Sequence, residues 1–248
     1  MSKAILVTGG SRGIGRATAI VAARRGWRVA INYAGDAGAA EATLAALRAA
    51  GSDGFVIKGD VAVEADVIAM FAATVKAFGR IDGLVNNAGI IAPHSRLADM
   101  DMARMKRLFE VNVLGAYLCA REAARLMSRS RGGHGGTIVN LSSVAARMGA
   151  PGEYVDYAGS KGAIDALTIG LARELAGEGV RVNAVRPGII ETDIHASGGK
   201  PDRAALLGPS VPLGRAGTAE EVAEAIIWLM SDAASYVTGT VLDVAGGR

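Results

Sequence analysis

A tyrosine and a lysine stand four residues apart at Tyr157 and Lys161, and Ser143 precedes the tyrosine by fourteen residues. A spacing of four puts both side chains on one face of a helix, about one turn apart. A phenol in water has a pKa of about 10, and a fixed cation nearby favours the phenolate and lowers that value. The spacing therefore predicts a proton donor and acceptor that works near neutral pH. On its own, such a pair more often marks only a solvated helix face.

A glycine-rich turn follows the first apolar segment of the chain. Residues 4–7 form a short apolar run typical of a buried strand, and residues 8–15 contain the spacing Gly-x-x-x-Gly-x-Gly at the start of a helical pattern. Glycines at a strand-to-helix turn let a phosphate approach the backbone N–H groups at the positive end of the helix. The turn therefore predicts a dinucleotide pyrophosphate site, with an ordinary tight turn as the alternative.

Several short motifs recur in a fixed order along nearly the whole chain. They are residues 8–15, Asp60-Val61, Asn86-Asn87-Ala88-Gly89, Asn112, Ser142-Ser143, residues 157–161, and Pro187-Gly188 through Thr192. In this order they resemble the motifs of the short-chain dehydrogenases/reductases. The resemblance implies an enzyme that transfers a hydride between a nicotinamide cofactor and a carbonyl or secondary alcohol carbon.

The resemblance also implies that Asn112, Ser143, Tyr157 and Lys161 are the catalytic residues. Tyr157 would donate or accept the proton, and Lys161 would lower the pKa of the tyrosine and hold the nicotinamide ribose. Ser143 would donate a hydrogen bond to the substrate oxygen, and Asn112 would hold a water that links Lys161 to solvent.

Two neighbouring residues compete for these roles. Ser142 and Ser143 are adjacent at the end of a strand, so their side chains point to opposite faces and only one of them can meet Tyr157. The Ser-Val-Ala-Ala run aligns Ser143 with the family serine, although its spacing to the tyrosine is one residue longer than is common. Tyr154 has no lysine four residues on, and we expect it to form a wall of the substrate pocket.

The cofactor site is expected at the motifs that follow the strands. The residues expected to contact the cofactor are Gly9, Ser11, Arg12, Gly13, Ile14, Gly15, Asn32, Asp60, Val61, Asn87, Ala88, Gly89, Tyr157, Lys161, Pro187, Gly188, Ile190 and Thr192. By resemblance, the Asp60 carboxylate would accept a hydrogen bond from the adenine amino group.

The choice between NADP(H) and NAD(H) depends on the end of the second strand. An NAD site normally has an acidic residue there, about twenty residues past the glycine turn. Here Asn32 stands at that place and no carboxylate follows until Asp36, while Arg12 can reach toward the same ribose. The sequence therefore favours NADP(H), and NAD(H) stays possible because Asp36 can still turn inward.

The 248 residues form one α/β domain, residues 1–248, without a second domain or internal repeat. Strand-like runs at 4–7, 28–33, 54–59, 83–87, 136–141, 180–185 and 240–244 alternate with amphipathic helical patterns. This alternation predicts a Rossmann fold, a doubly wound parallel sheet with helices on both faces. We expect seven strands in the order 3-2-1-4-5-6-7, the last position by resemblance. The long connection at 193–215 is interpreted as a substrate lid, with a flexible surface loop as the alternative.

Composition excludes several other classes of protein. The excess of 27 Lys and Arg over 24 Asp and Glu is small and forms no dense tract, so no nucleic-acid partner is expected. One cysteine forms no internal disulfide, and the three histidines lack metal-ligand spacing, so no metal is expected. No membrane contact is expected, because the first apolar run is too short for a signal peptide or a span. We expect a cytoplasmic protein and, by resemblance, a homotetramer built as a dimer of dimers.

The substrate class stays open at this stage. The motifs resemble both 3-oxoacyl-carrier-protein reductases and sugar dehydrogenases such as glucose 1-dehydrogenase, because they concern the cofactor and not the substrate. A ketone, a sugar or a 3-oxoacyl compound would each fit. A second hypothesis is a catalytically silent NADP(H)-binding regulator or scaffold, and the intact Asn112, Ser143, Tyr157 and Lys161 argue against it.

Overall fold

The computed structural model describes residues 2–248 and contains a seven-stranded parallel sheet. The strand order β3-β2-β1-β4-β5-β6-β7 confirms the predicted topology. The strands are β1 (Ala4–Val7), β2 (Arg28–Tyr33), β3 (Gly54–Lys58), β4 (Gly83–Asn86), β5 (Gly136–Leu141), β6 (Val180–Pro187) and β7 (Val241–Val244).

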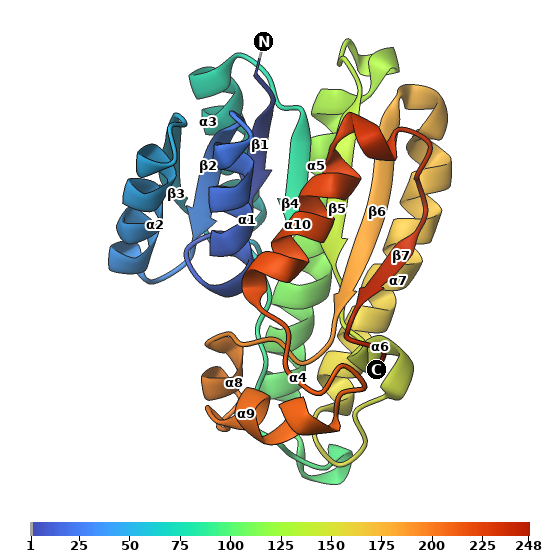
Figure 1. Cartoon of the computed structure of the whole chain (residues 1–248). Coiled ribbons are helices and arrows are strands. Elements are labelled where there is room, and N and C mark those ends of the chain that lie inside the picture. Colours follow the sequence, from blue (N-terminus) through green and yellow to red (C-terminus); the bar gives the residue numbers. More distant parts are fainter. Residues whose placement is uncertain (1) are drawn as a thin grey trace.

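Helices cover both faces of this sheet, as predicted (Figure 1). They are α1 (Gly13–Arg24), α2 (Ala37–Ala49), α3 (Glu64–Phe78), α4 (Met102–Phe109), α5 (Ala116–Met127), α6 (Ala145–Met148), α7 (Val155–Leu175), α8 (Ile194–Ser197), α9 (Arg203–Leu207) and α10 (Ala219–Met230). Helices α1, α2 and α10 pack on one face, and α3, α5 and α7 pack on the other.

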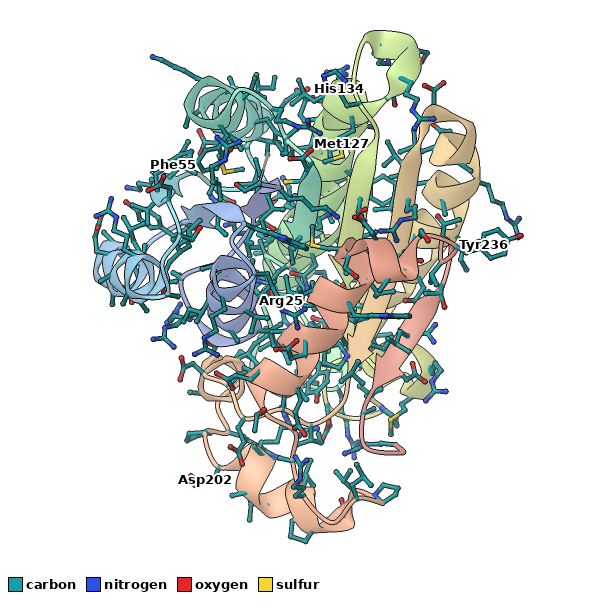
Figure 2. The ribbon with its side chains drawn as sticks, turned by 45° about the horizontal axis from the view of Figure 1, so that its top comes forward. Arg25, Phe55, Met127, His134, Asp202 and Tyr236 are labelled. Atoms are coloured by element: carbon teal, nitrogen blue, oxygen red, sulfur yellow. The ribbon has the colours of Figure 1, made fainter. Side chains whose placement is uncertain are left out.

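The alternation of side chains along each strand divides the core into two layers. On β1, Ile5 and Val7 pack with α1, α2 and α10, whereas Leu6 packs with α3, α5 and α7. Because both faces are covered, β1 is apolar at every position rather than at alternate ones. Figure 2 shows a side chain of the core and one of the surface: Met127 lies within the molecule and Tyr236 extends from its surface.

The ends of the elements differ by one or two residues from those predicted, for local reasons. Strand β4 ends at Asn86 because the N–H of Asn87 donates to the Val85 carbonyl and the Thr8 hydroxyl rather than to a neighbouring strand. Strand β6 continues to Pro187, which pairs with Val244 at the last ladder position. A proline is tolerated at this last position, because no further residue of the strand depends on a backbone N–H at that point.

Segment 193–215 lies beyond the carboxyl ends of the strands (Figure 1). It contains α8, α9 and a short 3₁₀ turn at Gly208–Ser210, so it is helical rather than a long irregular loop. No helix in the part of the chain that the structure describes is long and apolar enough to cross a membrane.

Candidate active site

Two neighbouring cavities open at the carboxyl ends of the strands. The first, of about 350 Å³, is lined by the glycine turn and is called the turn cavity; the second, of about 360 Å³, is lined by Tyr157 and is called the tyrosine cavity. Their shared lining residues are Ile14, Asn87, Gly89, Ile91, Thr192 and Ile194. The two cavities therefore form one continuous groove, at the sheet edge where ligands of such folds bind.

The glycine turn folds tightly against the start of α1. Gly9 has a φ of +60°, which L side chains rarely adopt, and a Cβ on Gly15 would lie 2.4 Å from the Gly9 carbonyl oxygen. The Asn87 amide secures the turn by donating to the carbonyls of Thr8 and Gly9, at 2.8 and 3.0 Å. Within residues 2–248 no side chain caps the N-terminus of α1, so its first N–H groups are free to meet an anion.

Asn32, expected at the cofactor ribose, is buried and bonded to backbone. Its Oδ1 accepts from the N–H of Gly9 at 3.1 Å, and its Nδ2 donates to the carbonyl of Gly59 at 2.9 Å. It lines the turn cavity while holding together the ends of three strands. Asp36 also lines the turn cavity, but its carboxylate caps α2 by accepting from the N–H of Ala39.

Asp60 and Val61 line the opposite wall of the turn cavity. The Asp60 carboxylate accepts from Arg107 at 2.7 Å and from the N–H of Ala62 at 3.0 Å. Partial burial raises the pKa of Asp60, but these two contacts outweigh it and leave the pKa below its ordinary value. Ser11, Arg12, Gly13 and Ala88 line the same cavity.

Tyr157 lies on the first turns of α7, with Ser143 beside its hydroxyl. The Ser143 hydroxyl forms a hydrogen bond with the Tyr157 side chain, whereas the Ser142 hydroxyl is buried and donates to the Lys161 carbonyl at 3.2 Å. The structure thus brings Ser143, not Ser142, to the tyrosine. Burial raises the pKa of Tyr157 to about 12, although the Ser143 hydrogen bond opposes the rise.

Lys161 lies one turn further along α7, with its Nζ 5.6 Å from the centre of the Tyr157 ring. Its ammonium group is buried and donates to the Leu141 carbonyl at 2.7 Å. Burial lowers the pKa of Lys161 to about 8, and the Asp165 carboxylate opposes this. The two groups are close, as the spacing predicts, but the pKa of Tyr157 is raised rather than lowered, because the burial of its own side chain is the largest cause of the shift.

Asn112 lies in a π-helical segment, Glu110–Gly115, between α4 and α5. Its side chain accepts from the N–H of Ile90 at 2.8 Å and donates to the Ile90 carbonyl at 2.9 Å and to the Ser160 hydroxyl at 3.2 Å. A Cβ on Gly89 would lie 3.4 Å from Asn112 Oδ1 and 3.6 Å from Lys161 Nζ. The structure therefore gathers Gly89, Asn112 and Lys161 on one side of the groove.

The segment after β6 forms the remaining wall. Pro187, Gly188, Ile190 and Thr192 all line the tyrosine cavity. Ile190 pairs with Gly217 in an isolated parallel bridge. Thr192 lies opposite the glycine turn, since a Cβ on Gly13 would come within 3.4 Å of its Cγ2.

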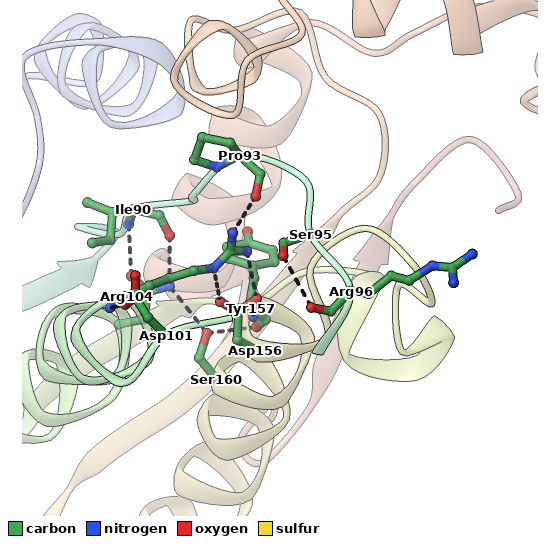
Figure 3. A network of polar contacts seen from close by, with 10 residues as sticks. Ile90, Pro93, Ser95, Arg96, Asp101, Arg104, Asp156, Tyr157 and Ser160 are labelled. Atoms are coloured by element: carbon green, nitrogen blue, oxygen red, sulfur yellow. Dashed lines mark hydrogen bonds and ion pairs between the residues drawn. The ribbon is translucent and has the colours of Figure 1, made fainter. Parts of the chain in front are cut away.

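An ion pair that sequence reasoning missed supports the start of α7, the helix that carries Tyr157 (Figure 3). Arg104 on α4 donates to both oxygens of Asp156, at 2.8 and 3.3 Å, and to the Pro93 carbonyl at 2.5 Å. Asp156 also accepts from the N–H of Tyr157 at 2.9 Å, and the Ser160 hydroxyl donates to the Tyr157 carbonyl at 2.7 Å. The backbone of Tyr157 is thus held on both sides. The position of Asp156 directly before Tyr157 was the only signal in the sequence.

A second cluster, of which the sequence predicted only Tyr154, forms the outer wall of the tyrosine cavity. Tyr154, predicted as a pocket wall, lines the cavity and packs edge-to-face on Tyr157 with ring centres 5.7 Å apart. Beside it, Glu153 and Arg203 form an ion pair at 2.7 Å. These two residues are 50 positions apart in sequence, and nothing in the residue types alone joins them.

Comparison with known proteins agrees with this geometry. A family model described as "Enoyl-(Acyl carrier protein) reductase" matches residues 9–248. The chain is 51% identical over 243 residues to an uncharacterized oxidoreductase, YgfF, of Escherichia coli K12, covering 98% of both chains. It is 42% identical over 247 residues to an L-rhamnose 1-dehydrogenase (NAD(P)(+)) of Sphingomonas sp. SKA58, covering 99% of this chain and 95% of that one.

A solved structure of a 3-ketoacyl-(acyl-carrier-protein) reductase from Brucella melitensis, complexed with NADH, superposes with a TM-score of 0.91 at 32% identity. The superposition covers 99% of this chain and 98% of that one. The matched family model, the relatives and the seven-stranded sheet agree over essentially the whole length. The chain belongs to the short-chain dehydrogenase/reductase family and is an oxidoreductase of the kind that acts on carbonyl and alcohol groups.

Proposed function

We propose that the protein is an NADP(H)-dependent oxidoreductase that interconverts a carbonyl compound and a secondary alcohol, with Tyr157 as the acid and base. The observation that carries this proposal is the continuity of the groove. Tyr157, Ser143 and Lys161 line one cavity, and this cavity shares a wall with the one that the glycine turn lines.

The turn cavity has the properties that a dinucleotide requires. It combines close-packed glycine backbone, uncapped N–H groups at the start of α1, and the Asp60 carboxylate at the far wall. The glycine turn would hold the pyrophosphate, Asp60 and Val61 the adenine end, and Pro187, Gly188, Ile190 and Thr192 the nicotinamide end. When bound, the cofactor supplies the hydride chemistry that side chains lack.

Residues of the chain then transfer the proton and donate hydrogen bonds to the substrate oxygen. Ser143 donates a hydrogen bond to the substrate oxygen as negative charge develops on it. Tyr157 transfers its proton to that oxygen in the reductive direction and recovers it in the oxidative direction. Lys161 holds positive charge beside the phenol and the ribose, and Asn112 holds a water that connects Lys161 to solvent.

The preference for NADP(H) rests on charge around the end of β2. Arg12 lines the turn cavity, where it can pair with a 2′-phosphate, and no carboxylate occupies the position of Asn32. The nearest acid, Asp36, is engaged as the cap of α2. The name of the Sphingomonas relative includes both cofactors and the Brucella structure holds NADH, so direct titration has to decide.

The test is fluorescence titration of the purified protein with NADPH and NADH, followed by a panel of small carbonyl compounds monitored through the absorbance of the reduced cofactor. Tighter binding of NADPH with turnover supports the proposal. NADH binding at least as tight as NADPH would refute the cofactor preference. Binding without any turnover would favour the silent regulator or scaffold instead.

We also propose that the protein works as a homotetramer in the cytoplasm on a small-molecule substrate. Large apolar side chains are exposed on α5 and α7, at Tyr117 and Ile169, and near the carboxyl-terminal strand, at Trp228 and Tyr236. Exposed apolar groups on two separate faces support a dimer of dimers. Sedimentation velocity tests the assembly, and cell fractionation tests the location.

A further inference from the structure

The outer wall of the tyrosine cavity is built from charged and aromatic side chains of three separate segments of the chain. Glu153 and Tyr154 precede α7, Arg203 begins α9, and His94 follows β4. Of these, Glu153, Tyr154 and Arg203 line the same cavity as Tyr157. This wall stands where the part of a substrate remote from the reacting carbon would lie.

The Glu153–Arg203 pair is held rigidly in this wall. Arg203 donates to the two Glu153 oxygens at 3.0 and 2.7 Å, and its Nη1 lies 3.5 Å from His94 Nε2. The guanidinium also stacks on the Tyr154 ring at 5.4 Å, and Tyr154 in turn packs on Tyr157. Arg203 is only 8% exposed, so both its position and its orientation are fixed relative to Tyr157.

This arrangement leaves hydrogen-bonding capacity directed at the cavity. A guanidinium has five N–H bonds, and the contacts of Arg203 with Glu153 and His94 involve only its two terminal nitrogens, so they do not use all five. The Glu153 oxygens keep further lone pairs, and its side chain is 34% exposed. Arg248, which also lines the cavity, has a buried Nη1 without a partner in the described chain.

Adjacent donors and acceptors match a particular kind of ligand. A hydroxyl group both donates and accepts, so neighbouring hydroxyls can bond to Arg203 and Glu153 at once. A hydrocarbon chain would cover these groups and leave them unsatisfied, which disfavours its binding. A carboxylate reaching Arg203 would lie beside the like charge of Glu153.

We propose that the Glu153–Arg203 pair recognises neighbouring hydroxyl groups, and that the substrate is a compact, uncharged polyhydroxylated carbonyl or hemiacetal compound. This inference rests on the proposed oxidoreductase function and specifies its substrate class. In oxidation of a ring hemiacetal, the anomeric C–H would leave as hydride to the oxidised cofactor, the hydroxyl proton would pass to the phenolate form of Tyr157, and the product would be a lactone.

The experiment compares three classes of alcohol with the purified full-length protein and NADP⁺. The polyhydroxylated probes are D-glucose, D-xylose and L-arabinose, the hydrocarbon probe is cyclohexanol, and the acidic probe is 3-hydroxybutanoate. We expect kcat/KM for at least one sugar to exceed that for cyclohexanol and 3-hydroxybutanoate by tenfold or more. Reduction of 2,3-butanedione with NADPH is measured in parallel, as a test of oxidoreductase activity that does not involve hydroxyl recognition.

Two variants then test the pair itself. Arg203→Gln and Glu153→Gln are expected to lower the ratio of sugar to cyclohexanol kcat/KM by about tenfold or more. The matched control is Arg215→Gln, which breaks an exposed ion pair with Glu221 in the same segment but outside the tyrosine cavity. This control should leave the ratio unchanged.

The ratio separates recognition from a purely structural role. If kcat/KM falls by the same factor for the sugar and for cyclohexanol in both variants, the pair has only a structural role and the inference is overturned. Faster wild-type turnover of cyclohexanol or 3-hydroxybutanoate than of every sugar also overturns it, while butanedione reduction would still uphold the oxidoreductase function. Absence of turnover with every compound, butanedione included, would instead refute the proposed function and the inference with it.

Discussion

In the turn cavity, most of the contacts at the strand ends join polar side chains to backbone, as Asn32 does to Gly59 and Asn87 does to Thr8, and the Asp60–Arg107 pair is the exception. Around the tyrosine cavity, side chains from separate loops bond to one another, as Arg203 does to Glu153. Side chain-to-backbone contacts fix a shape without depending on a second side chain. Side-chain pairs fail when either partner changes. We infer that the shape of the turn cavity depends less on individual side-chain pairs than the shape of the tyrosine cavity does.

The largest expected effect comes from removing the Tyr157 hydroxyl group from the tyrosine cavity. Tyr157→Phe should lower kcat by about 10²- to 10⁴-fold, because the proton donor is lost. The affinity for NADPH should change little, since the glycine turn is untouched. Steady-state kinetics and fluorescence titration check both parts. Near-normal turnover in this variant would refute the acid–base role.

The next prediction tests whether side-chain pairs stabilise the structure around the tyrosine cavity. Asp156 is only 1% exposed, so Arg104→Gln should leave a buried charge without its partner and destabilise the protein by about 3–5 kcal/mol. Urea unfolding measures this change. Turnover should fall more than NADPH affinity, because Asp156 accepts a hydrogen bond from the N–H of Tyr157 and Arg104 donates one to the Pro93 carbonyl.

The matched control lies on the same helix. Lys106 is exposed and lies 3.9 Å from Glu110, so Lys106→Gln should change stability by less than about 0.5 kcal/mol. Equal stability of the Arg104 and Lys106 variants would contradict a structural role for the buried pair.

The burial of Lys161 should affect how the free energy of unfolding depends on pH. Its pKa is lowered to about 8 in the folded protein from an ordinary value of 10.5, so the unfolded chain binds more protons between these values. Stability should therefore rise as pH increases from about 8 toward 10.5. Tyr157, whose pKa is raised to about 12 from 10, opposes the rise above pH 10.

Lys161→Met isolates this contribution. Urea unfolding of the wild type and the variant at pH 8, 9 and 10 should give a difference in stability that moves in favour of the wild type as pH rises. A difference that is constant over this range would show that Lys161 is not desolvated in the folded protein.

A smaller effect concerns the turn cavity alone. Arg12→Ala should weaken NADPH binding about tenfold, or about 1.4 kcal/mol, and leave NADH binding within about twofold. Parallel titrations with the two cofactors measure the ratio. Equal loss for both cofactors would mean that Arg12 supports the turn rather than the 2′-phosphate.

The sequence predicted the features that depend on local patterns and missed those that depend on side-chain pairs between distant residues. The glycine turn, the strands and the Tyr157–Lys161 spacing are local patterns, and strand order is constrained by the connection rules of parallel sheets. The Arg104–Asp156 and Arg203–Glu153 pairs join residues about 50 positions apart, and their types give no sign of the pairing. The dominance of burial over charge at Tyr157 also depends on packing, which spacing does not report.

The most direct test of the central claim mixes the purified protein with NADPH and 2,3-butanedione and follows the absorbance of the reduced cofactor together with the amount of hydroxyketone formed. The account predicts that each mole of NADPH consumed yields one mole of hydroxyketone in the wild type, with almost no consumption in Tyr157→Phe. Tight NADPH binding without consumption, for this and every other carbonyl compound and sugar, would contradict the account and identify a cofactor-binding protein without turnover.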